Sequence, residues 1–157
     1  MLQEFGADWG GRPETLTDKL KNDIERFRDR SFLKAAMAAS ALTALADGEV
    51  SLEERYRIDA ILAREPALGA FNAAKAVSIF QDYVHALRRE PQRARRVLMA
   101  KVERMAEKPR KARTVMRVSW LIIAADQDVT PAEAAAFDEL CRTLMLDPED
   151  VRQGVMN

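Results

Sequence analysis

The stretch ALADGEVSLEE at residues 44–54 joins two segments whose apolar residues have the spacing of α-helices. A related stretch, ADQDVTPAE, follows at residues 125–133. Asp47 of the first aligns with Asp126 of the second, 79 positions later. The same offset aligns three further polar pairs, which are Glu49 with Asp128, Ser51 with Thr130, and Glu54 with Glu133. The sequence therefore predicts two copies of a unit made of a helix, an acidic turn and a second helix.

The rest of the chain has the same helical period, and no segment alternates as a strand would. We predict an all-α fold, a single bundle of seven to eight helices that contains the two pseudo-repeated units. The expected helices are 14–28, 31–46, 52–64, 70–89, 92–107, 110–125, 131–145 and 148–155. The segment VMRVSWLIIAA at 115–125 is apolar almost all round, so we expect it to be the central helix, with the alanine-rich segment at 32–46 beside it.

Length and composition limit the classes of protein to consider. A chain of 157 residues suits one domain, for which we expect 14–157, preceded by a flexible N-terminal segment at 1–13. Cys141 and His85 are the only residues of their types, which excludes a disulfide framework and a Cys/His zinc cluster. The N-terminal residues do not resemble a signal peptide, and no apolar run approaches the roughly 20 residues of a membrane span. We therefore expect a cytoplasmic protein.

The acidic turns have two explanations, which the sequence leaves open. In the first, they only cap helices: Ser51 with Glu54, and Thr130 with Glu133, have the spacing of capping boxes, and Gly48 can adopt a left-handed conformation. In the second, they bind a hard divalent cation, calcium or magnesium, through oxygen ligands. The candidate metal ligands are Asp47, Glu49, Glu54, Asp126, Asp128 and Glu133. The spacing is not that of an EF-hand.

A basic block is concealed by the neutral total charge. Residues 88–117 contain 12 Lys and Arg but only 3 Glu. Such a block is either a solvated surface or a docking surface for acidic protein, anionic lipid or nucleic-acid phosphate. It contains no aromatic residue, which argues against stacking on single-stranded nucleic acid. The candidate interaction surface is made of Arg93, Arg96, Arg104, Arg110 and Lys111.

The twin turns, each followed by an amphipathic helix in an all-helical chain of this length, resemble those of the tellurite-resistance TerB family. The resemblance covers the chain from about residue 32 to its C-terminus. It implies an all-α bundle, a role in the response to tellurite or chemical stress, and no catalytic activity. It also implies an acidic, metal-linked site, which would fall on Asp47 and Glu54 in the first unit and on Asp126 and Glu133 in the second. Gln127 departs from the pattern, because Gly48 holds its position in the first unit.

From these observations we expect a non-enzymatic stress-response or adaptor module without a cofactor, apart from a divalent cation at the turns. We expect a protein partner, which could bring the chain to the inner membrane, and we do not expect nucleic acid as the partner. The alternative is a protein that binds nucleic-acid or lipid phosphate through the basic block at 88–117. A metal-dependent hydrolase is a weaker alternative, because no second set of polar residues is available to position a substrate. We expect Cys141, which aligns with Leu62, to be a buried apolar residue rather than a reactive thiol.

Overall fold

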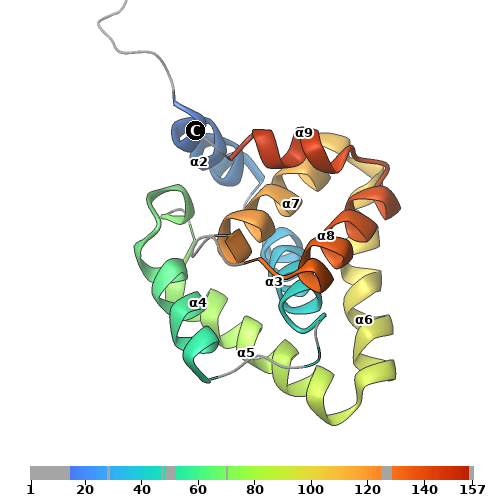
Figure 1. Ribbon diagram of the computed structural model, residues 1–157. Coiled ribbons are helices and arrows are strands. Elements are labelled where there is room, and N and C mark those ends of the chain that lie inside the picture. Colours follow the sequence, from blue (N-terminus) through green and yellow to red (C-terminus); the bar gives the residue numbers. More distant parts are fainter. Residues whose placement is uncertain are drawn as a thin grey trace, which may run out of the picture.

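The computed structural model describes residues 15–27, 29–46, 48, 52–69, 71–124 and 129–155, without the side chains of residues 52–55 and 66. In this part of the chain there are eight α-helices and two short 3₁₀ helices, and no strand (Figure 1). The predicted all-α fold is therefore confirmed. The helices are α2 (Leu16–Phe27), α3 (Arg30–Ala44), α4 (Leu52–Arg64), η1 (Pro66–Leu68), α5 (Ala73–Arg89), α6 (Pro91–Glu103), η2 (Arg104–Glu107), α7 (Pro109–Ala124), α8 (Pro131–Thr143) and α9 (Pro148–Gln153).

Local chemistry explains most helix starts. Proline is the first residue of α6, α7, α8 and α9, where its missing N–H would have no partner inside the helix. The predicted helix at 70–89 begins later, at Ala73, because the side chain of Asn72 caps it by accepting a hydrogen bond from Lys75 N at 3.1 Å. The predicted helix at 92–107 is two elements, since α6 ends at Glu103 and η2 follows with tighter winding.

The centre of the bundle is α3, and the prediction that 115–125 is the central helix was wrong. Twelve of the 15 residues of α3 are buried, compared with nine of the 16 residues of α7. Figure 1 shows α3 in the middle of the molecule, where it packs against α5, α6, α7 and α8. Alanine side chains line α3 and allow helices to approach it from several sides. Its buried hydroxyls, on Ser40 and Thr43, donate hydrogen bonds of 2.8 Å to carbonyls four residues earlier, so they lie in the core without an unsatisfied donor.

The second helices of the two units correspond closely. Helix α4 covers residues 52–64 and α8 covers 131–143, which is the offset of 79 found in the sequence. The aligned pair Ile58 and Phe137 is buried, and so is the pair Leu62 and Cys141. This pattern supports the duplicated helix–turn–helix unit. The superposition of the two turns stays a prediction, because most of their residues lie outside the described part of the chain.

Candidate functional site

The first acidic turn follows the C-terminus of α3. Gly48 has a φ of +104°, in the region that favours glycine, as predicted. Its N–H donates a hydrogen bond of 2.9 Å to the carbonyl of Leu45, which caps the helix. Asp47, Glu49 and the side chain of Glu54 lie outside the described residues. Their role as metal ligands is therefore still a prediction.

The second turn shows the predicted capping box at the start of α8. Glu133 N donates to Thr130 Oγ1 at 3.1 Å, and Thr130 N donates to Glu133 Oε1 at 2.9 Å. Glu133 is only 8% exposed, so one oxygen of a nearly buried carboxylate is held by the cap. Asp126 and Asp128 lie outside the described residues. Among the side chains that are described, no group of three His, Cys, Asp or Glu residues is arranged to hold a metal ion.

Some cations of the basic block are exposed on the surface, and others form ion pairs within the molecule. Arg93, Arg96, Arg104 and Arg110 are exposed, and their binding to a partner stays a prediction. Lys111 does not belong to that surface, so the sequence prediction for this residue needs correction. It is 7% exposed, and its Nζ lies 2.7 Å from Asp29 Oδ2.

The burial of Lys111 follows from its place on α7. It shares one helical face with the buried residues Val115, Val118 and Ile122, which follow at steps of four, three and four. This face packs against the central helix, and the ammonium group reaches Asp29 at the N-terminus of α3. Other cations of the block also pair within the molecule, because Arg95 lies 3.7 Å from Glu139 on α8, and Arg113 and Arg117 lie within 4 Å of Asp150 on α9.

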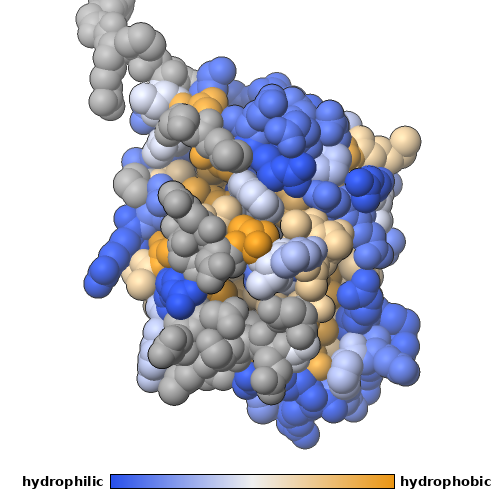
Figure 2. All heavy atoms as spheres, in the orientation of Figure 1, coloured by the Kyte–Doolittle hydropathy of each residue, from blue (hydrophilic) through white to orange (hydrophobic). Residues whose placement is uncertain are grey.

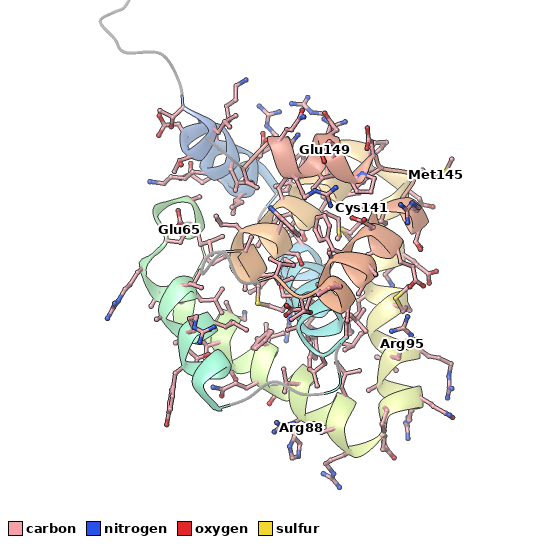
Figure 3. The ribbon with its side chains drawn as sticks, viewed as in Figure 1. Glu65, Arg88, Arg95, Cys141, Met145 and Glu149 are labelled. Atoms are coloured by element: carbon pink, nitrogen blue, oxygen red, sulfur yellow. The ribbon has the colours of Figure 1, made fainter. Side chains whose placement is uncertain are left out.

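A pocket of about 590 Å³ lies next to the first turn, where the C-termini of α3 and α5 meet the start of α6. Figure 3 shows two of its residues, Arg88 on α5 and Arg95 on α6. Most of the remaining lining residues are apolar. The full lining is Leu42, Leu45, Ala46, Gly48, Leu87, Arg88, Pro91 and Arg95. Its volume falls in the range of typical ligand sites, and two guanidinium groups beside an apolar floor suit an acidic group attached to an apolar one.

The sequence does not predict this pocket, because its lining residues come from three separate segments. Arg88 and Arg95 belong to the basic block and Gly48 to the acidic turn, but nothing in the sequence indicated that these segments meet. The position of Gly48 in the lining connects the pocket with the acidic turn, because Asp47 and Glu49 are its chain neighbours. Gly48, the described residue of the turn, therefore belongs to the candidate site.

The single cysteine does not contribute a reactive group. Cys141 is fully buried, and burial raises the pKa of its thiol to about 12, so the thiolate is not formed near neutral pH. The prediction of a buried, unreactive cysteine is thus supported. His85 is exposed on α5. Figure 2 shows hydrophilic residues over the right-hand part of the face where α6 and α8 lie, with hydrophobic residues in its middle. Within the described residues, no helix has the length and apolar character needed to cross a bilayer.

The described helices form an all-α bundle in which α4 and α8 correspond at an offset of 79 residues. The model of a family described as "Tellurite resistance protein TerB" matches residues 33–154, which is most of the chain. The chain therefore belongs to the TerB family, as its twin turns indicated. No significant match was found among curated proteins or among solved structures.

Proposed function

We propose that this chain is a non-enzymatic adaptor in the response to tellurite or related chemical stress. The observation that carries the proposal is the pocket beside the first turn of a TerB-family bundle, because it offers Arg88 and Arg95 next to an apolar floor. Such a lining suits a partner segment with an acidic and an apolar side chain. The protein acts in the cytoplasm, and a partner can bring it to the inner membrane.

We further propose that a divalent cation regulates this adaptor through the acidic turns. Asp47, Glu49 and Glu54 provide the oxygen ligands that calcium and magnesium prefer. Since Gly48 lines the pocket, a cation held by its neighbours would act directly at the rim. The second turn is the weaker candidate, because Glu133 uses one oxygen for the cap and Gln127 replaces the glycine.

The adaptor proposal is tested by recovery of partners from native cytoplasm and membrane fractions, with and without chelator. We expect Arg88→Glu/Arg95→Glu to lose a specific partner. A second double variant, Arg93→Glu/Arg96→Glu, makes the same change of charge on the exposed face of α6 and serves as the matched control. If the control loses the partner and the pocket variant keeps it, the basic surface rather than the pocket binds. If both folded variants keep it, the proposal fails.

The cation proposal is tested by thermal melting of the wild type, Asp47→Ala and Asp126→Ala with calcium, magnesium or manganese. A cation that binds only the folded state raises the melting temperature as its concentration increases. We expect Asp47→Ala to lose this increase and Asp126→Ala to keep most of it. Identical melting curves with cation and with chelator would leave the turns with capping alone.

A further inference from the structure

Five cations from separate parts of the chain meet at the N-terminal end of α3. Arg30 and Lys34 belong to α3 itself, Lys75 to α5, Lys101 to α6, and Arg104 to η2. Helix α3 packs against both α5 and α6, which brings together positions that lie about 70 residues apart in the sequence. The fold thus concentrates positive charge at a place where no single stretch of sequence would reveal it.

Four of these cations line a pocket of about 210 Å³. Its lining consists of Arg30, Ser31, Lys34, Lys101 and Arg104, and contains no carboxylate. This volume is below the range of pockets for drug-sized ligands, so the pocket suits a small group. Arg30 and Lys34 come from α3, Lys101 from α6 and Arg104 from η2. These four guanidinium and ammonium groups provide donors that can point at one anion.

No described residue neutralises this cluster by an ion pair. Arg95, Lys111 and Arg113 of the basic block all have carboxylate partners, but none of the four lining cations has one within the described part of the chain. The nearest capping carboxylate, on Asp29, is already occupied: Oδ1 accepts from Phe32 N and Ser31 Oγ, and Oδ2 accepts from Lys111 Nζ.

The electrostatic effect is visible on Lys34. Its pKa is lowered, first by the positive charge of Arg30, and then by burial and by the charges of Lys101, Lys75 and Arg104. Glu103 and Glu107 line a neighbouring hollow, which Ser31 and Arg104 share with the cationic pocket, but neither glutamate is among the lining residues of the cationic pocket itself. Repulsion among like charges persists in the folded state unless an anion enters.

We propose that this cationic pocket, formed by Arg30, Ser31, Lys34, Lys101 and Arg104, binds a phosphate group or a similar small oxyanion. The side chains carry the argument, since the helix end is already capped by Asp29. Arginine and lysine together offer several charge-assisted hydrogen bonds to tetrahedral oxygens, whereas the Ser31 hydroxyl in the lining donates to Asp29 Oδ1. The pocket does not rest on the adaptor proposal, and it shares no lining residue with the pocket at the other end of α3.

The test is calorimetric titration of the full chain with inorganic phosphate, and separately with sulfate, against chloride at constant ionic strength. We expect saturable binding by the wild type and a loss of about tenfold in affinity for each cation removed, so that Lys34→Gln/Arg104→Gln binds about a hundredfold more weakly. Arg93→Gln/Arg96→Gln removes the same charge from exposed positions on α6 and is expected to bind as the wild type does.

Melting in buffer without phosphate checks that the variants fold. Because repulsion is relieved, we expect Lys34→Gln/Arg104→Gln to melt at the wild-type temperature or above it. If it does not fold, Arg104→Gln alone, at an exposed position, replaces it. Equal losses of affinity in the pocket variant and the control would show unspecific screening and overturn the proposal, as would a wild type that binds phosphate no better than chloride.

A parallel experiment distinguishes the sources of the phosphate group. Vesicles of phosphatidylcholine with a phosphorylated inositol lipid are sedimented with the protein, with and without inorganic phosphate. If the protein sediments with the vesicles and inorganic phosphate reverses this, the result supports a pocket that binds a lipid headgroup. Calorimetric binding without sedimentation supports the pocket with free phosphate as ligand. The proposal is overturned if neither occurs.

Discussion

The contact between Asp29 and Lys111 allows the sharpest test of the fold, through the substitution Asp29→Ala. One carboxylate performs three tasks: its oxygens lie 2.7 Å from Phe32 N, 2.9 Å from Ser31 Oγ and 2.7 Å from Lys111 Nζ. The lysine side chain is 8% exposed, whereas the aspartate side chain is 57% exposed. Removal of the carboxylate therefore leaves α3 without its cap and a nearly buried ammonium group without its partner.

The expected loss of stability follows from these two effects. Loss of an N-cap costs about 1 kcal/mol. An unpaired charged donor costs about 1–3 kcal/mol, and we take the lower part of this range because solvent screens a partner as exposed as Asp29. The sum is about 2–3 kcal/mol in the free energy of unfolding. For a chain of 157 residues this lowers the melting temperature by roughly 5–10 °C.

A double-mutant cycle with Lys111→Met separates the ion pair from the cap. Methionine keeps the apolar stem of lysine and removes its charge, so Asp29→Ala should cost about 1 kcal/mol less in that background. The measurement is urea unfolding followed by circular dichroism at neutral pH. If the two substitutions are additive within about 0.3 kcal/mol, the pair contributes no coupling and the reasoning is wrong.

The same carboxylate gives a dependence on pH with a definite sign. Partial burial raises the pKa of Asp29, but the hydrogen bonds from Lys111, Phe32 N and Ser31 outweigh it and lower the pKa from 3.8 to about 2. A group whose pKa is lower in the folded state contributes its full stability at any pH above its unfolded-state pKa. That contribution is lost as the pH falls through its folded-state pKa. The difference in stability between wild type and Asp29→Ala should therefore be constant above about pH 5 and decrease as the pH falls toward 2.

Three further substitutions test local features of the fold. Thr130→Ala should lower the free energy of unfolding by about 1 kcal/mol, while Thr130→Ser keeps the capping hydroxyl and most of the stability; equal losses in urea unfolding would contradict the capping box. Met145, labelled in Figure 3, has a φ of 60° and is 91% exposed. Met145→Gly should therefore raise the free energy of unfolding by up to about 1 kcal/mol and increase the melting temperature, whereas Met145→Ala should not. The thiol of Cys141 should react with a disulfide reagent only as fast as the protein unfolds, and rapid reaction of the folded protein would show that its burial is misjudged.

The sequence was sufficient for the features that depend on local chemistry. The starts of α8 and α9 at proline, and the capping box of Thr130 and Glu133, follow from groups a few residues apart. The starts of α6 and α7 were predicted one residue after their prolines. The C-terminus of α8 was placed two residues too late. Met145 N and Leu146 N donate to the carbonyls of Arg142 and Cys141, so a Schellman turn ends the helix there, and Met145 holds the position in which glycine would have announced it.

The features that were missed depend on how helices cross. The segment 115–125 was predicted as the centre because it is apolar almost all round, but alanine-rich α3, whose small side chains let helices pack on several sides, occupies that place. Lys111 was assigned to the surface as one of many cations, although its spacing from Val115 and Val118 already placed it on the buried face. The cationic pocket joins Arg30 and Lys34 to Lys101 and Arg104, which only the packing of α3 against α6 brings together.

The two pockets lie at opposite ends of the central helix, and this separation decides how the two proposals relate. Leu42 and Leu45 line the pocket beside the acidic turn, whereas Arg30 and Lys34 line the cationic pocket. Equivalent ends of the two sites lie 11 to 12 residues apart on α3, which is about 17 Å at 1.5 Å per residue. This distance exceeds two Debye lengths of about 8 Å each, so exposed charges at the two sites are largely screened from each other. A phosphate group at one end should therefore not displace an acidic partner segment from the other. Partner recovery that is unchanged by saturating phosphate, at constant ionic strength, would agree with two independent sites, and competition would mean that both ligands meet the same basic residues.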